Sequence, residues 1–155
     1  MKSIKAKSAV PSDLPQINKL IELAVMNWPM ADRVKRRAVP VLQYDATDLE
    51  FLEVHVATIQ GEIVGVAAWD ATASESLPNG KGGLFHGLYV LPLIQGQGIG
   101  ETLMEAVFED ARIHDMTGLL IKAQRVSKGY FAHQGIPALA ANDGEYPWQY
   151  WKALA

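Results

Sequence analysis

The hydrophobic pattern of residues 84–110 predicts a strand, a tight turn and a helix in succession. In the strand that ends before Pro92, alternate residues share one face: Leu84, His86, Leu88 and Val90. Beyond the turn, apolar residues recur at the spacing of an amphipathic helix: Leu103, Met104, Val107, Phe108 and Ala111. Acidic residues of this helix are expected mostly to face water: Glu101, Glu105, Glu109 and Asp110. We expect the rest of the chain to be organised around this unit.

The N-terminal third predicts a short strand at residues 4–10 followed by two helices. Ser12 is placed to cap the first helix, and Pro15 falls in its first turn, where a missing N–H has no cost. Residues 31–38 predict a second, short helix that ends at Pro40.

From residue 54 onward, strand patterns dominate. Two alternating runs, 54–59 and 63–69, are joined by Gln60-Gly61-Glu62 and predict a hairpin. A continuous apolar run at 119–123 predicts a strand buried on both faces, parallel to the strand at 84–91 through the intervening helix. The remaining segments predict a loop at 70–83, a helix at 128–134 and two paired strands at 136–141 and 146–153.

Length and composition fit one globular domain spanning residues 1–155. Hydrophobic residues make up 49% of the chain and charged residues 20%, and the net charge of −3 argues against a nucleic-acid or anionic-membrane binder. The absence of cysteine excludes disulfides, thiolate metal sites and a cysteine nucleophile. Without an apolar leader or a run of ~18 apolar residues, we expect a cytoplasmic protein.

Three glycines at alternate positions open the central helix: Gly96, Gly98 and Gly100. The first N–H groups of a helix have no intrahelical partner, and glycine lets a phosphate approach them closely. Residues 95–100 therefore predict a pyrophosphate cradle, the alternative being a turn whose glycines serve only positive φ angles. The Walker and dinucleotide motifs do not fit, because the turn ends Gly-Ile-Gly-Glu with G-x-G-x-G spacing.

What fits instead is Gln/Arg-x-x-Gly-x-Gly/Ala after a strand ending Val-x-Pro, matched by Gln95, Gly98 and Gly100 behind Val90-Leu91-Pro92. This stretch resembles the GNAT superfamily of N-acetyltransferases, and the similarity is weaker outside residues 84–110. The resemblance implies an α/β fold with a mixed, mostly antiparallel sheet of about six or seven strands, flanked by about four helices, in which one parallel strand pair splays apart. It also implies acetyl-CoA as co-substrate and no metal.

Coenzyme contacts are carried over from the family to matching positions. They are main-chain and turn residues, together with two positions of a second motif: Leu88, Tyr89, Val90, Gln95, Gly96, Gln97, Gly98, Ile99, Gly100, Gln124 and Phe131. That second motif, Asn-x-x-Ala-x-x-Phe-Tyr-x-x-x-Gly-Phe, is altered here: Gln124 replaces the asparagine, Ser127 the alanine, and Tyr130-Phe131 inverts the aromatic pair. The usual acid for the thiolate falls on Phe131, which has no proton to give, so either Tyr130 or solvent protonates the thiolate.

His86 is the candidate general base, because an imidazole with a pKa near ~6.5 can accept a proton at neutral pH. The alternative is a buried, hydrogen-bonded histidine. Trp28 is the candidate acceptor-pocket residue, since this region lines that pocket in the family. The basic run Arg33 to Arg37 is expected to be a solvated face, with the binding of an anionic substrate or of the coenzyme's 3′-phosphate as the alternative.

The predicted reaction is direct transfer of acetyl from acetyl-CoA to a primary amine of a small molecule or peptide. No nucleophile motif is present, so no covalent intermediate is expected. Two alternatives remain: a coenzyme-A-binding sensor that has lost catalysis, and an acyltransferase for a longer acyl group. The expected partners are the amine and, in a homodimer, a second copy of the chain; a monomer is equally compatible.

Overall fold

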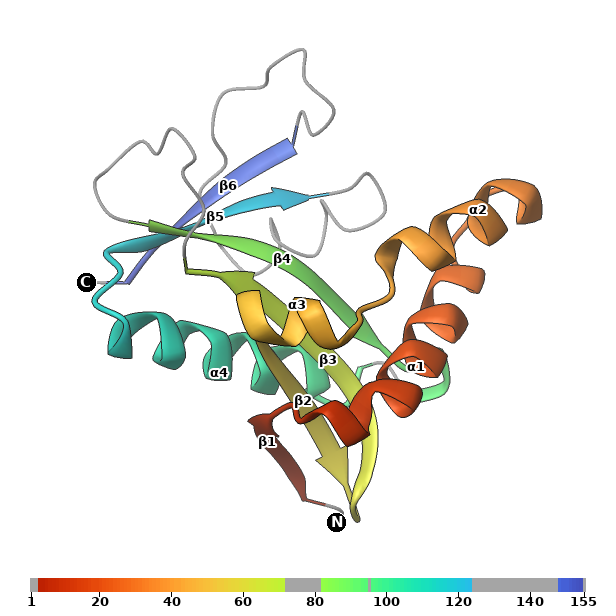
Figure 1. The fold of residues 1–155 in the computed structure, drawn as a ribbon, viewed down its shortest axis with the longest axis horizontal. Helices are drawn as coiled ribbons and strands as arrows, with labels where there is room; N and C mark the ends of the chain where they lie inside the picture. Colours follow the sequence, from red (N-terminus) through yellow and green to blue (C-terminus); the bar gives the residue numbers. More distant parts are fainter. Residues whose placement is uncertain (1–2, 72–81, 95, 124–147, 155) are drawn as a thin grey trace. The chain divides into compact units, whose positions relative to one another are not determined.

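The structure is a computed structural model that describes residues 3–71, 82–94, 96–123 and 148–154 (Figure 1). Its elements in chain order are β1 (Ile4–Ser8), the 3-10 turn η1 (Pro11–Asp13), α1 (Leu14–Met26), α2 (Asp32–Leu42), α3 (Ala46–Phe51), β2 (Glu53–Ile59), β3 (Glu62–Asp70), β4 (Gly82–Val90), η2 (Pro92–Ile94), α4 (Ile99–Ile113), β5 (Gly118–Ala123) and β6 (Trp148–Ala153). The described strands form one mostly antiparallel sheet in the order β1-β2-β3-β4-β5-β6, with β4 and β5 parallel. The predicted mixed α/β architecture is confirmed.

Contacts divide the chain into two compact units. The first comprises Met1–Ala68 and Gly87–Val107, and the second comprises Trp69–His86 and Phe108–Ala155. A single domain over residues 1–155 stays a prediction. Among the described helices, none is both long and apolar enough to cross a membrane.

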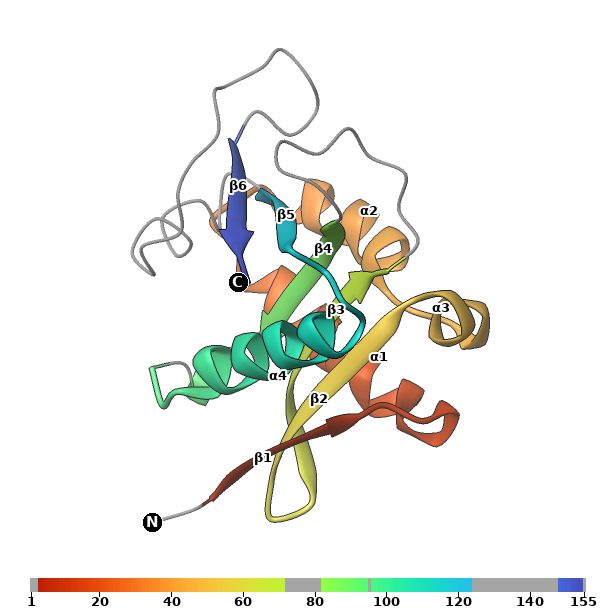
Figure 2. The same cartoon turned by 90° about the vertical axis from the view of Figure 1, so that its left-hand side faces the viewer.

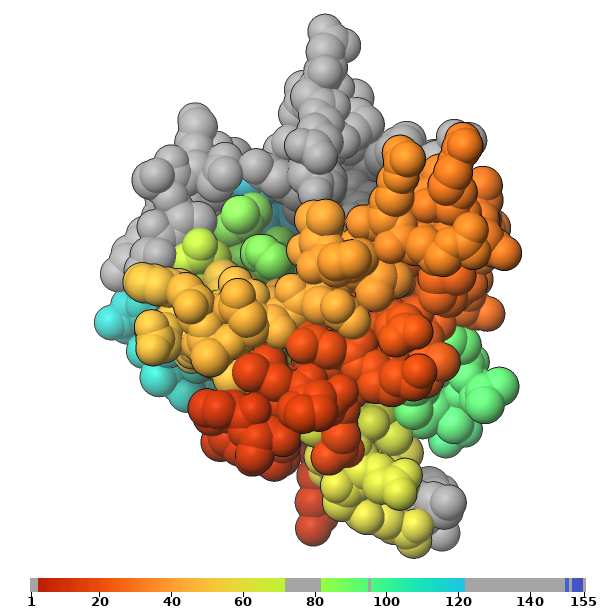
Figure 3. All heavy atoms as spheres, turned by 45° about the vertical axis from the view of Figure 1, so that its right-hand side comes forward, coloured from red at the N-terminus to blue at the C-terminus, as the bar shows by residue number. Residues whose placement is uncertain are grey.

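The core of the first unit is built on the apolar face of α1. The residues of that face are buried: Ile17, Leu20, Ile21, Ala24 and Val25. They belong to one cluster with strand residues of the same unit, including Val54, Val56 and Val66, and with Tyr44. Figure 3 shows α1 in red and α2 and α3 in orange lying side by side on the surface of this unit.

Helix α4 begins against β3 at Gly65. A Cβ at this glycine would lie 2.8 Å from Leu103 Cδ1 and 2.9 Å from Ile99 Cγ2, so only glycine allows the helix to approach this closely. The hairpin before it is confirmed, with Gln60 and Gly61 both at positive φ in its turn. The first turns of α4 are therefore held on a rigid strand.

In the second unit, β5 lies between two partners (Figure 2). It pairs in parallel with β4, from Gly82↔Gly118 to Phe85↔Ile121, and antiparallel with β6. Strand β4 continues beyond this register to Val90. The splaying of this parallel pair, which the family resemblance implies, stays a prediction.

The expected cap of the first helix is wrong. Ser12 does not cap it: the Asp13 carboxylate accepts a 3.0 Å hydrogen bond from the Val10 N–H, and α1 begins at Leu14. After α4, Asp115 adopts the left-handed conformation with φ 61°, and β5 begins at Gly118.

Helix α2 is longer than predicted and contains Pro40. Proline removes one N–H donor, but the next turn still closes through a 3.1 Å bond from the Gln43 N–H to the Val39 carbonyl, so the helix continues past it. Helix α3 was not predicted; Asp45 caps it by accepting a 2.9 Å bond from the Asp48 N–H. The predicted helix at 128–134 and strand at 136–141 lie outside the described residues.

Candidate functional site

The turn before α4 holds two glycines in the left-handed region. Gly96 has φ +85° and Gly98 has φ +82°. A Cβ at Gly96 would meet nothing within 4 Å, and one at Gly98 would meet only the Glu101 carboxylate at 3.7 Å. The backbone therefore needs glycine for positive φ, and the space where a Cβ would stand is open. The pyrophosphate cradle stays a prediction.

The start of α4 is fixed from two sides. Ile99 is buried to 1% exposure, and the Gly98 carbonyl accepts bonds from the Thr102 N–H at 3.0 Å and the Thr102 hydroxyl at 2.8 Å. The first helical N–H groups, from Ile99 onward, have no partner within the helix and carry its positive dipole end. Gln97 and Gly96 are exposed beside them, so the turn offers donors to an anion.

Strand β4 presents two different faces. Phe85 and Tyr89 are buried, whereas His86 is exposed and Leu88 and Val90 are half-buried. The exposure of His86 argues against a buried structural histidine at this position. An exposed imidazole can exchange protons with a bound substrate and with water.

On the buried face, Tyr44 meets β4 at Gly87. Its hydroxyl lies 3.4 Å from the position that a Gly87 Cβ would occupy, and the Tyr89 hydroxyl lies at the same distance from it. Burial raises the pKa of Tyr44, with smaller contributions from Tyr89 and Asp48. The sequence patterns gave no sign of this pair, since Tyr44 precedes a short helix that they missed.

Asn18 of α1 holds Tyr44 in place. Its side-chain oxygen accepts a 2.9 Å bond from the Tyr44 N–H, and its nitrogen donates a 2.8 Å bond to the Tyr44 carbonyl. The neighbouring Gln43 amide donates to the Asn18 carbonyl at 3.1 Å. In the sequence, Asn18 appears only as a polar residue within the periodic pattern of α1. Nothing there indicates its pairing with Tyr44, which lies 26 residues away.

The other first-unit candidates separate into packed and exposed groups. Trp28 is half-buried and packs against the first-unit core, and its role in an acceptor pocket stays a prediction. Arg33, Arg36 and Arg37 are exposed, as expected of a solvated face. Lys35 corrects that expectation: it is 8% exposed, and its Nζ donates a 2.8 Å bond to the Met26 carbonyl.

Four predicted site residues lie outside the described part of the chain: Gln95, Gln124, Tyr130 and Phe131. Their roles in coenzyme binding and thiolate protonation stay predictions. The described candidates Gly96, Gly98, Leu88 and Tyr89 all fall within the first unit.

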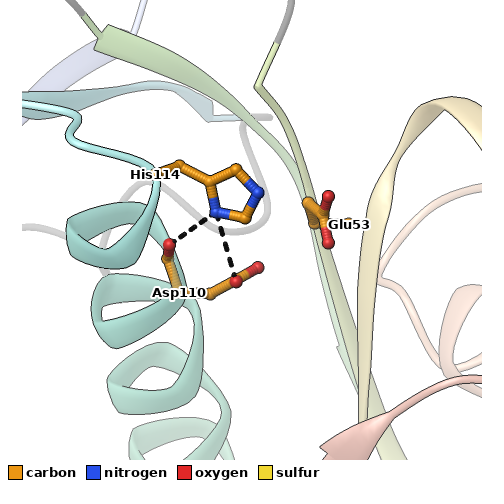
Figure 4. Close-up of side chains that lie close together, drawn as sticks. All are labelled: Glu53, Asp110 and His114. Carbon is orange, nitrogen blue, oxygen red and sulfur yellow. Dashed lines mark hydrogen bonds and ion pairs between the residues drawn. The ribbon is translucent and has the colours of Figure 1, made fainter.

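A separate polar group lies in the second unit (Figure 4). His114 Nδ1 is 2.8 Å from the Asp110 carbonyl oxygen and 3.4 Å from its Oδ1. The Trp69 indole stands edge-on to the His114 ring, with centroids 5.2 Å apart. This group is built from the end of β3 and the last turn of α4.

Comparison with known sequences places the chain among acetyltransferases. The acetyltransferase (GNAT) domain family matches residues 50–135, which is more than half of the chain. An uncharacterized N-acetyltransferase of Archaeoglobus fulgidus is 45% identical over 58 residues, or 37% of this chain and 40% of that protein. The matched region is thus less than half of that relative's length.

Solved structures share the fold at low sequence identity. PaiA N-acetyltransferase from Thermoplasma acidophilum, in complex with coenzyme A, has a TM-score of 0.80 at 12% identity, covering 97% of this chain and 99% of that one. A GCN5-related N-acetyltransferase from Rhodopseudomonas palustris has a TM-score of 0.77 at 20% identity, covering 99% and 98%. A GNAT acetyltransferase from Brucella melitensis, in complex with acetyl-CoA, has a TM-score of 0.68 at 19% sequence identity, covering 99% of this chain and 89% of that one. With more than half of its length matched by the family and the fold shared throughout, the chain belongs to the GNAT acetyltransferase family.

Proposed function

We propose that this protein transfers the acetyl group of acetyl-CoA directly to a primary amine of a small molecule or peptide. The observation that carries this proposal is the open turn at the start of α4, where Gly96 and Gly98 combine positive φ with free space above the backbone. The structural relatives from Thermoplasma acidophilum and Brucella melitensis, solved with coenzyme A and acetyl-CoA, support it.

The residues present fit this co-substrate. The N–H groups from Gly98 to Gly100 are available to the pyrophosphate, and the family resemblance implies that the pantetheine amides pair with the main chain of Leu88–Val90. Acetyl-CoA supplies a thioester, whose carbonyl carbon is activated toward an amine. The helix dipole of α4 adds positive potential at the phosphate end.

The reaction needs two proton transfers. His86, exposed on β4, accepts the proton that the amine must lose before or during attack. Tyr130 or solvent returns a proton to the leaving thiolate; a coenzyme A thiol with a pKa near that of cysteine (~8.5) makes solvent sufficient. No group of the protein needs to carry the acetyl group.

A screen of primary amines with acetyl-CoA, followed by release of free thiol, tests the function. We expect at least one class, such as arylalkylamines, polyamines or peptide N-termini, to release thiol well above the rate without amine. Mass spectrometry of the product should show one added acetyl group on nitrogen. Tight coenzyme A binding with no amine acetylated would instead support the sensor, which the altered motif at residues 124–136 already motivates.

A further inference from the structure

Helix α2 turns its arginines outward and its lysine inward. The exposed residues of α2 share one side of the helix, which we call the arginine face: Arg33, Val34, Arg36, Arg37, Pro40 and Val41. The opposite side is buried or half-buried, and comprises Lys35, Ala38, Val39 and Leu42. Figure 3 shows α2, in orange, with side chains that project from the surface of the first unit.

The positive charges of the arginine face have no negative partner in the described part of the chain. The one acidic residue of α2 is Asp32, and its Oδ1 lies 3.1 Å from Nζ of Lys35 on the opposite side. None of the three arginines forms a hydrogen bond or an ion pair with another described residue. A local concentration of positive charge therefore stands on a chain whose net charge is −3.

The spacing of the three arginines is unfavourable for the helix on its own. Arg33 precedes Arg36 by three residues and Arg37 by four, which are the separations at which like charges repel along a helix. Arg33 also lies near the N-terminal end, where the helix dipole disfavours a cation, while the last turn holds no basic residue. A solvated face needs only polar side chains, whereas clustered guanidinium groups are stabilised when an anionic partner neutralises them.

The side chains of the arginine face indicate the chemistry of that partner. A guanidinium group binds a carboxylate through two parallel N–H···O bonds. Val34 and Val41 are 45% and 81% exposed and lie two turns apart on one flank, where they offer apolar contact. The face has no aromatic residue on which a base could stack, and the net charge of the chain disfavours polyanions and anionic membranes.

We propose that the arginine face is a docking surface for an acidic, amphipathic segment of a partner protein. Carboxylates of that segment pair with the three arginines, and its apolar side chains cover Val34 and Val41. This docking goes beyond acetyl transfer, because the whole face lies on α2, away in sequence from the glycine turn and from β4.

Titration of the full chain with a labelled peptide of about four helical turns, with glutamates on one face and leucines on the other, tests the docking surface. We expect a Kd below about 1 mM at low salt, and at least about tenfold weaker binding when glutamine replaces glutamate in the peptide. Joint replacement Arg33→Gln and Arg37→Gln should weaken binding of the acidic peptide at least about tenfold. Both arginines are exposed, and circular dichroism establishes that this variant is folded.

Joint replacement Lys5→Gln and Lys19→Gln is the matched control, since it removes the same charge from exposed positions on β1 and α1. It should leave peptide binding unchanged. Equal peptide binding by the arginine variant, or no peptide binding by the unmodified protein, overturns the docking surface and leaves the proposed function standing. Tighter binding of single-stranded DNA or of phosphatidylserine vesicles contradicts the assigned partner, and loss of coenzyme A affinity in the arginine variant assigns these arginines to the coenzyme instead.

Discussion

The indole nitrogen of Trp69 donates a 2.9 Å hydrogen bond to Oδ2 of Asp110. Trp69 has no exposed surface, so its N–H cannot use water instead. Asp110 was expected to face water with the other acids of its helix, and this contact corrects that expectation. The bond ties the end of β3 to the last turns of α4 within the second unit.

Replacing Asp110 by alanine should destabilise the protein by about 1–3 kcal/mol, because a buried donor loses its acceptor. Urea unfolding of the variant gives the change in free energy directly. Glu109→Ala is the matched control, since Glu109 is exposed and forms a surface ion pair with Arg112 at 3.7 Å. Equal stability of the two variants would show that the Trp69 bond contributes nothing.

The raised pKa of Tyr44 predicts that the folded protein loses stability at alkaline pH. The unfolded phenol ionises near its ordinary pKa of 10.0, whereas burial keeps the folded phenol protonated to higher pH. The stability that it contributes is therefore fully present below pH ~10 and falls above it, by up to about 1.4 kcal/mol per pH unit. Tyr44→Phe has no proton to lose at this site, so its stability should fall less steeply between about pH 9 and 11. Parallel curves from urea unfolding would mean that Tyr44 ionises equally in both states.

The strand, turn and helix of residues 84–113 could be predicted from the sequence because their signals are local. The spacing of hydrophobic residues changes from every second residue to about every 3.6 residues at the glycine turn, and no distant contact is needed to recognise it. Helix α3 could not be predicted, because residues 46–51 are too few to show helical periodicity. The Asp45–Asp48 capping box was its only sequence signal.

The parts of the site that were missed depend on contacts between distant segments. Asn18 and Tyr44 look like an ordinary helix polar residue and a loop aromatic until the fold brings them together. Lys35 likewise belongs to a basic run, and it is buried because its Nζ bonds the Met26 carbonyl and pairs with the Asp32 carboxylate at 3.1 Å. Composition and periodicity do not encode such partners.

Removing the candidate base should change the pH dependence of catalysis. His86→Gln keeps approximate size and hydrogen bonding but cannot titrate, so turnover with an accepted amine should fall about 10²–10⁴-fold. The acidic limb of kcat/KM near pH ~6.5 should disappear, while acetyl-CoA binding stays normal. His55→Gln, a buried histidine on β2, is the control for histidine loss. A retained limb in His86→Gln would assign the ionisation to another group, such as the amine.

Coenzyme binding at the glycine turn is the central claim, and titration of coenzyme A into Gly98→Val tests it most directly. Gly61→Val is a matched control, because Gly61 has φ +83° and open space like Gly98 (φ +82°), but lies in the β2–β3 turn. Both substitutions strain the backbone, and circular dichroism establishes that each variant is folded. We predict that Gly98→Val weakens coenzyme A binding by more than about tenfold while Gly61→Val leaves it unchanged. Equal affinity in the unmodified protein and a folded Gly98→Val variant would contradict the cradle.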